Sequence, residues 1–218
     1  MNLRRSFRTL LQRSEVGADW IAGRALRRHS HLREAGWFRS FRAGMPVDAQ
    51  GMPLPWYTYS SITFIAGRLQ PSMSVFEYGS GNSTLWWSRH VAQVSSCEHD
   101  PEWHATMRPK LPANAECVLV ELAEGDGYAS TITHNDRRYD VVVIDGRHRN
   151  RCARFAPGAL SDGGVIVWDN SDRPEYREGF DLLTSAGFRR IDFWGMGPIN
   201  AYTWCTSVFY RSGNCFGI

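Results

Sequence analysis

The sequence predicts an α/β fold: a doubly wound, mostly parallel seven-stranded sheet with an antiparallel C-terminal hairpin strand and a helical N-terminal extension. From residue 74 onward, short apolar runs alternate with helix-like segments, and several runs are β-branched and apolar on consecutive positions. Continuous apolar runs are typical of strands that are buried on both faces, and strands alternating with helices are typical of parallel sheets. The last two runs instead alternate with period two and predict a hairpin that adds an antiparallel strand at the edge of the sheet.

Five apolar runs supply the predicted parallel strands, at residues 74–78, 92–98, 116–122, 139–145 and 164–169. The predicted helices between them cover about 83–90, 101–109, 149–160 and 174–186. Residues 188–194 and 202–211 flank a Gly-Pro loop and form the predicted hairpin at the edge of the sheet. In a sheet of this kind, ligands bind in the crevice at the carboxyl ends of the strands.

The N-terminal part of the chain has a different composition and residue pattern. Residues 3–29 place arginines and apolar residues at helix-like intervals, which predicts one or two amphipathic helices. Residues 44–61 are rich in proline and glycine and predict a loop, and residues 59–69 predict a helix capped by Ser60 or Ser61. We therefore expect a basic helical extension and loop over residues 1–52 and a folded domain over residues 53–218.

Charge and composition restrict the classes of protein. Residues 1–43 hold ten arginines against three acidic residues, a net charge of +7, whereas the whole chain carries +3. A basic arm of this kind binds anionic membranes or nucleic acid, although the same pattern is typical of a solvated helix. No apolar run approaches the roughly 18 residues of a membrane span, and the N-terminus does not read as a secretory signal. The five cysteines are scattered without a C-x-x-C pair, so a reduced, cytoplasmic location is expected.

Four predicted strands end in acidic residues, namely Glu77, Glu98, Asp145 and Asp169. A single acid at the end of a strand is more often a helix cap or a surface residue. Four of them in register at the carboxyl ends of parallel strands indicate that they converge on one site.

The loop G-S-G-N-S-T, residues 79–84, follows the first strand and resembles a loop that binds nucleotides. Thr84 stands where the dinucleotide fingerprint requires its third glycine, which allows close approach around a pyrophosphate. A ligand without phosphates does not need that glycine. Glu98 follows Gly79 by 19 residues, at the end of the second strand, where an acid accepts hydrogen bonds from ribose hydroxyls.

The pattern E-x-G-x-G-x-S-T, followed by C-E-H-D-P-E-W, resembles class I S-adenosylmethionine-dependent methyltransferases over roughly residues 72–211. The resemblance implies a Rossmann-like methyltransferase domain within residues 53–218. It implies that the loop backbone receives the methionine part of the cofactor, that the acid after the second strand binds the ribose and that the next residue lies against the adenine. The cofactor-binding residues expected on this basis are Glu77, Gly79, Ser80, Gly81, Ser83, Glu98, His99, Asp126 and Asp145.

Two further segments bear on the reaction. The segment V-V-V-I-D-G-R-H-R-N-R (141–151) resembles the I-D-G-x-H signature of small-molecule methyltransferases that act on hydroxyl groups. The segment G-V-I-V-W-D-N-S-D-R-P (164–174) resembles the D-N pair of their metal-dependent relatives. The resemblance implies Asp145 and His148 as catalytic residues, with His148 as the base, and Asp145, Asp169 and Asn170 as ligands of a divalent cation such as Mg²⁺. The alternatives are a helix-capping His148 and acids that order loops without an ion.

The predicted function is methylation of a small-molecule hydroxyl, such as that of a sugar or natural product. Trp56, Tyr57, Tyr59 and the loop 195–204 either cover the acceptor or anchor the N-terminal segment. The alternatives are a nicotinamide-dependent oxidoreductase and a non-catalytic, membrane-associated module that binds a cofactor. Nucleic-acid methylation is disfavoured because no N-P-P-Y-type motif follows the fourth strand. A homo-oligomer is compatible with the sequence.

Overall fold

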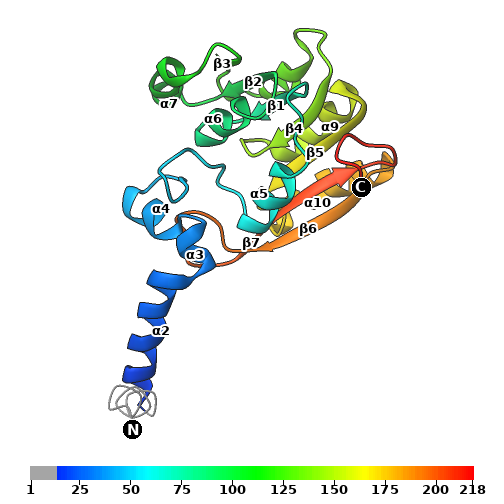
Figure 1. The fold of residues 1–218 in the computed structure, drawn as a ribbon. Coiled ribbons are helices and arrows are strands. Elements are labelled where there is room, and N and C mark those ends of the chain that lie inside the picture. Colours follow the sequence, from blue (N-terminus) through cyan, green and yellow to red (C-terminus); the bar gives the residue numbers. More distant parts are fainter. Residues whose placement is uncertain (1–13) are drawn as a thin grey trace.

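The computed structural model describes residues 14–218 and confirms the predicted α/β fold (Figure 1). Its seven-stranded sheet has the order β3-β2-β1-β4-β5-β7-β6. The strands are β1 (Ser74–Tyr78), β2 (Gln93–Glu98), β3 (Ala115–Leu119), β4 (Tyr139–Ile144), β5 (Leu160–Asp169), β6 (Arg189–Gly195) and β7 (Trp204–Tyr210).

The first five strands pair in parallel, with Val75 opposite both Val94 on β2 and Val141 on β4. The final strand, β7, pairs antiparallel with β5 on one side and with β6 on the other. The predicted hairpin is therefore confirmed, and its second strand lies inside the sheet rather than at the edge. The edge position on the other side belongs to β3, which explains why Val118 and Leu119 of an apolar run are exposed.

Helices cover both faces of the sheet (Figure 1). They are α5 (Tyr59–Ala66), α6 (Asn82–Ser88), α7 (Pro101–Met107), α8 (Gly127–Ser130), α9 (Arg149–Ala159) and α10 (Arg177–Ser185), with 3₁₀ turns η1 (Arg108–Lys110), η2 (Thr131–Thr133) and η3 (Pro174–Tyr176). The four helices predicted between the strands are present, whereas the short α8 was not predicted.

Alternation along β4 divides the core between the two faces. Val142 and Ile144 belong to a cluster with Cys152 of α9 and Leu183 of α10. Val141 and Val143 belong to the opposite cluster, which contains Ile65 of α5 and Trp87 of α6. Because both faces of the central strands are buried, the carboxyl ends of these strands are held rigidly for a site.

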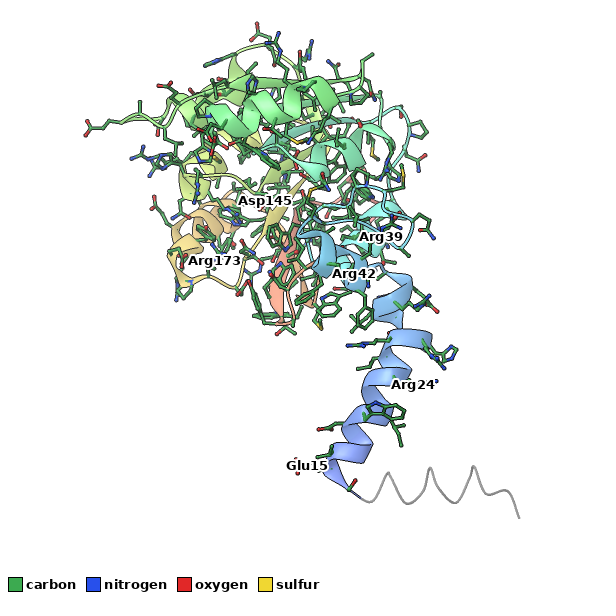
Figure 2. All side chains as sticks on the ribbon, turned by 90° about the vertical axis from the view of Figure 1, so that its left-hand side faces the viewer. Glu15, Arg24, Arg39, Arg42, Asp145 and Arg173 are labelled. Atoms are coloured by element: carbon green, nitrogen blue, oxygen red, sulfur yellow. The ribbon has the colours of Figure 1, made fainter. Side chains whose placement is uncertain are left out.

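The N-terminal arm consists of α2 (Glu15–His29), α3 (His31–Glu34) and α4 (Trp37–Ala43). Helix α2 stands away from the body, whereas α4 lies where the arm joins it (Figures 1 and 2). The Trp37 indole donates a 2.8 Å hydrogen bond to the carbonyl of Asn200, in the loop between β6 and β7. The helix predicted over 3–29 is confirmed for residues 15–29, and its beginning lies outside the described residues.

The predicted cap of α5 is wrong. The helix begins at Tyr59, and its N-cap is Thr58, which has an extended backbone. The Thr58 hydroxyl bonds the carbonyl of Phe193 and the hydroxyl of Ser61 rather than a backbone N–H of the helix, while the Ser61 hydroxyl donates to the carbonyl of Thr58. Ser60 and Ser61 therefore lie inside the first turn. Among the described helices, none has the length and apolar character required to cross a membrane.

Candidate cofactor and acceptor sites

The glycine loop after β1 depends on one backbone conformation that favours glycine. Gly79 has φ +91°, and its N–H donates a 2.8 Å hydrogen bond to the carbonyl of Cys97 on β2. A Cβ atom at Gly79 would lie 3.4 Å from Cα of Gly146, in the loop after β4. The positive φ favours glycine at this position, whereas the Cβ distance would be an ordinary van der Waals contact.

Thr84 fastens the loop to the end of β1. Its buried hydroxyl donates a 2.5 Å hydrogen bond to Oε2 of Glu77 and accepts a 3.0 Å bond from the N–H of Gly81. The side chain at the position of the third fingerprint glycine is thus part of the loop's own hydrogen bonding. Oε1 of Glu77 has no hydrogen-bond partner among the residues that the structure describes, although it is buried. Burial raises the pKa of Glu77 to about 8.

Glu98 organises the loop after β2 and touches the glycine loop. Its Oε1 accepts hydrogen bonds from the N–H groups of His99 and Asp100, at 2.7 and 3.0 Å. Its Oε2 accepts a 3.1 Å bond from the N–H of Ser80. A carboxylate oxygen accepts two hydrogen bonds, so Oε2 retains capacity for a ligand hydroxyl.

Two side chains outside the predicted set frame this loop. The indole N–H of Trp103 on α7 donates a 2.7 Å hydrogen bond to the carbonyl of Ser80. Nε of Arg147 lies 3.4 Å from Nε2 of His99, while Nδ1 of His99 lies 2.7 Å from the Glu98 carboxylate. An aromatic ring, an imidazole and a guanidinium provide the flat surfaces that a nucleobase stacks on.

These groups surround a hollow of about 560 Å³, hereafter the cofactor hollow. Of the predicted cofactor residues, seven line it: Glu77, Gly79, Ser80, Ser83, Glu98, His99 and Asp145. The lining does not include Gly81, whose N–H is bonded to Thr84. Nor does it include Asp126, which is exposed at the start of α8 with its carboxylate 3.9 Å from Nε of Arg151.

A second hollow of about 510 Å³, hereafter the acceptor hollow, lies at the ends of β4 and β5. It shares five residues with the cofactor hollow and adds polar and aromatic groups from the end of β5, the residues that follow it, the loop before β7 and the start of β7. The shared residues are Trp56, Asp145, Arg149, Asn170 and Arg173, and the added ones are Asp169, Asp172, Asn200, Tyr202, Thr203 and Trp204. Asp145 and Arg173 both lie on the flank of the body shown in Figure 2. Two ligands bound in these hollows would meet along the shared wall.

Asp145 and Arg149 of this wall form a cluster with Asp169 of the acceptor hollow. Nη2 of Arg149 lies 2.9 Å from Oδ1 of Asp145. Oδ1 of Asp169 accepts hydrogen bonds from the indole of Trp204 at 3.0 Å and the hydroxyl of Thr206 at 2.6 Å, both on β7. Burial raises the pKa of Asp145, against the opposing effect of Arg149, and burial together with the nearby Asp145 raises the pKa of Asp169 to about 8.

The cluster does not fit the predicted Mg²⁺ site. One oxygen of Asp145 is paired with a guanidinium, and one oxygen of Asp169 accepts two bonds from β7. A divalent cation placed between the two carboxylates would also lie beside the positive charge of Arg149, which opposes its binding. No group of three or more His, Cys, Asp or Glu side chains within residues 14–218 is arranged to hold a metal ion. Asn170 lines both hollows and has φ +53°.

His148 lies in the loop between β4 and α9, with φ +49°. Its exposed ring faces the ring of Tyr128, with centroids 6.5 Å apart, and it lines neither hollow. Its neighbours Arg147 and Arg149 both line the cofactor hollow. The role of base stays a prediction for His148.

Sequence reasoning missed Arg149 and Trp103. The signal for Arg149 was available, since an arginine four residues after Asp145 is placed for an ion pair at the start of a helix. Trp103 gave no such signal, because only the folded chain brings α7 against the glycine loop.

Residues 76–171 match the family model described as a methyltransferase domain. No curated protein matches the chain. The match runs from β1 to the residues that follow β5, so it contains most of the cofactor hollow.

Several solved structures share the fold. Precorrin-6y C5,15-methyltransferase from Geobacter metallireducens aligns over 70% of this chain and 87% of its own, with 15% identity and a TM-score of 0.55. SMU.1697c from Streptococcus mutans, in complex with SAH, aligns over 69% and 96%, with 14% identity and a TM-score of 0.51. Precorrin 8w decarboxylase from Methanobacterium thermoautotrophicum aligns over 78% and 97%, with 16% identity and a TM-score of 0.53.

The methyltransferase domain matched over residues 76–171, together with the fold shared with solved methyltransferases, supports one class of enzyme, the S-adenosylmethionine-dependent methyltransferases. The predicted enzyme class and Rossmann-like sheet are thereby supported, and the fold is one that binds S-adenosylmethionine, whereas the predicted Mg²⁺ is not supported. The structural relatives carry different acceptors or reactions in their names, so the fold alone does not specify the acceptor.

Proposed function

We propose that this enzyme transfers the methyl group to a hydroxyl of a small polar molecule, such as a sugar or a hydroxylated natural product. The observation that carries the proposal is the acceptor hollow, which shares a wall with the cofactor hollow. Its lining combines the carboxylates of Asp169 and Asp172, the amides of Asn170 and Asn200 and the indole of Trp204. Carboxylates and amides accept hydrogen bonds from hydroxyl groups, and aromatic rings stack on sugar rings.

The dimensions of the hollow also support a small acceptor. A volume of about 510 Å³ lies within the roughly 300–1,000 Å³ that is typical of small-molecule sites. Trp56 and Tyr202 stand at the hollow with 43% and 64% of their surface exposed, so they remain available to a bound ring. An acceptor bound there meets the cofactor along Asp145, Arg149 and Asn170.

The reaction is an in-line displacement. An oxygen lone pair of the acceptor forms the new C–O bond while the C–S bond of the sulfonium breaks and its electron pair goes to sulfur. The products are a methyl ether and S-adenosylhomocysteine, and the hydroxyl proton passes to a base, the role predicted for His148. Most of the rate enhancement then comes from alignment of the two ligands across the shared wall.

A two-part experiment tests the proposal. The purified enzyme is incubated with labelled cofactor and a panel of sugars, phenols and other hydroxylated molecules, and methyl ethers are identified by mass spectrometry. Cofactor affinity is measured by calorimetry for the wild type, for Glu98→Ala and for His148→Ala. Glu98→Ala should lose cofactor binding and His148→Ala should retain it while losing turnover. Methylation of amines or of RNA, with no hydroxyl acceptor found, would overturn the proposed acceptor class.

The nicotinamide alternative has its own test. Thr84 is bonded to Glu77 and to the Gly81 N–H, so it occupies the space where a dinucleotide loop brings helix and strand together. Saturation with NADH or NADPH should leave the melting temperature unchanged, whereas S-adenosylhomocysteine should raise it.

A further inference from the structure

The carboxyl ends of β4 and β5 are joined by one buried guanidinium, that of Arg149, which is 7% exposed. Its Nε donates to the carbonyl of Gly146 at 3.0 Å, and its Nη2 donates to both the carbonyl and Oδ1 of Asp145, each at 2.9 Å. Its Nη1 donates to the carbonyl of Asp169. These four bonds use four of the five N–H groups of a guanidinium, so one N–H on Nη1 has no partner among residues 14–218.

The position of this guanidinium is informative because Arg149 lines both hollows. The remaining N–H therefore belongs to a group at the wall where cofactor and acceptor meet. The guanidinium lies beside the two acids that the sequence predicts as ligands of a divalent cation. Its N–H groups bond the carbonyl and carboxylate oxygens of Asp145 and the carbonyl of Asp169.

We propose that Arg149 is the fixed cation of the acceptor site: its remaining N–H donates to the acceptor oxygen, and methyl transfer needs no divalent metal ion. This inference rests on the proposed function, because it concerns the oxygen that receives the methyl group. As the hydroxyl proton leaves, negative charge develops on that oxygen until the C–O bond forms. A positive charge that is already held in place stabilises this oxygen without reorganisation during the reaction.

Several contacts hold the guanidinium in one orientation. The left-handed backbone of His148 turns the chain into α9, so that the first residue of the helix lies against the loop after β4. The guanidinium also lies over the ring of Tyr176, with 5.2 Å between Cζ and the ring centroid. A lysine at this position could not make the same set of bonds, because an ammonium lacks the planar fork of donors.

The first test measures metal binding and needs no acceptor. Wild-type enzyme is dialysed against EDTA, saturated with S-adenosylhomocysteine and titrated with MnCl₂, using calorimetry and the electron paramagnetic resonance signal of free Mn²⁺. We expect no saturable Mn²⁺ site. Stoichiometric binding that is weakened in Asp169→Asn would overturn the proposal, whether or not any Arg149 variant folds.

The second test uses variants and the acceptor identified above. Arg149→Met should lower kcat about 100-fold, the scale measured for loss of one donor to a developing oxyanion, while cofactor Kd changes by no more than about threefold. Arg149→Lys should recover only part of the loss. Arg154→Met is the matched control, since Arg154 lies on the same helix, is exposed and pairs with Glu178 at the surface. It should behave as the wild type.

The outcomes separate the two proposals. If EDTA-treated wild type turns over at full rate and Arg149→Met loses kcat, both proposals stand. If turnover of the hydroxyl acceptor requires Mg²⁺ or Mn²⁺, or if Arg149→Met keeps its kcat, the role of Arg149 is wrong while hydroxyl methylation stands. If no hydroxyl is methylated, the proposed acceptor class fails, and the Mn²⁺ titration still decides whether a metal binds beside Arg149.

Discussion

The hydroxyl of Thr84 donates a 2.5 Å hydrogen bond to the carboxylate of Glu77, and the same hydroxyl accepts a bond from the N–H of Gly81. A side chain on α6 therefore connects the end of β1 to the glycine loop. In a dinucleotide-binding fold, a glycine stands at this position so that the helix approaches the pyrophosphate. Here the side chain fills the space and orients an acid, which suits a ligand that carries positive charge instead of phosphates.

Thr84→Val tests this connection. Valine has a similar shape but leaves Glu77 and the Gly81 N–H without their partner, so the free energy of unfolding should fall by about 1–3 kcal/mol. Thr84→Ser keeps the hydroxyl and should lose less. Urea denaturation of the three proteins provides the measurement, and a loss in Thr84→Ser without a loss in Thr84→Val would show that the methyl group, not the hydroxyl, matters.

The raised pKa of Glu77 makes stability depend on pH. With a pKa of about 8 in the folded protein and 4.5 as its ordinary value, the carboxyl binds a proton in the folded state that it loses in the unfolded state. The contribution is intact below pH 4.5 and is lost as the pH rises toward 8, by about 1.4 kcal/mol per unit across that interval. Relative to Glu77→Gln, the ligand-free wild type should become less stable from pH 5 to pH 8. Parallel pH profiles in thermal unfolding would contradict the assignment.

Cofactor binding should release a proton from the same group. The cofactor brings a sulfonium and an ammonium, and a positive charge beside Glu77 lowers its pKa and favours the carboxylate. Calorimetry at pH 7 in buffers of different ionisation enthalpy should show proton release in the wild type. Glu77→Gln should bind without that release, and release of the same size in both proteins would point to another group.

Glu98 is expected to contribute directly to cofactor affinity. Its carboxylate receives three backbone N–H groups from two loops, so Glu98→Ala removes the partner of all three and a ligand acceptor together. We expect cofactor affinity to fall by about 2–3 kcal/mol, on the scale of hydrogen bonds to charged groups. Glu116→Ala on β3, whose carboxylate pairs with Arg137 at the surface, is the control and should bind the cofactor normally.

The arm provides a prediction that is independent of catalysis. Helix α2 exposes Val16, Trp20 and Leu26 together with Arg24, Arg27 and Arg28, and residues 1–43 carry a net charge of +7. Phosphatidylcholine vesicles that contain phosphatidylserine should therefore sediment the protein, with about 1 kcal/mol lost for each arginine replaced by glutamine. Pure phosphatidylcholine vesicles are the control, and preference for RNA over these vesicles would reverse the expectation.

The order of the elements and the ends of most strands follow from the sequence because apolar periodicity is a local property. All five predicted parallel strands occur within a few residues of their expected ranges. Glu77 and Glu98 could be placed for the same reason, since each lies at the carboxyl end of a strand. The cofactor class followed from the resemblance of the glycine loop, with Thr84 in place of a third glycine and Glu98 after the second strand, to class I S-adenosylmethionine-dependent methyltransferases.

The rest of the site depends on contacts between distant residues. Trp204 and Thr206 bond Asp169 across 35 and 37 positions, and Trp103 reaches Ser80 across 23. The apolar periodicity of a sequence does not predict contacts between residues that are this far apart. The predicted metal site shows the same limit: three suitable side chains were identified correctly as neighbours of one crevice, but the sequence did not show that a guanidinium lies between them.

The position of β7 between β5 and β6 means that the cofactor hollow and the acceptor hollow are completed at different points of synthesis. All the residues that line the cofactor hollow precede position 174, whereas the groups that orient Asp169 come from a strand that begins at Trp204. During synthesis, the residues that line the cofactor hollow are therefore made before the residues of β7 that bond Asp169 in the acceptor hollow. Loss of the last strand would remove both partners of Asp169 and also Val208 and Phe209, which belong to the two core clusters, so the acceptor side and the packing of the sheet depend on the same strand.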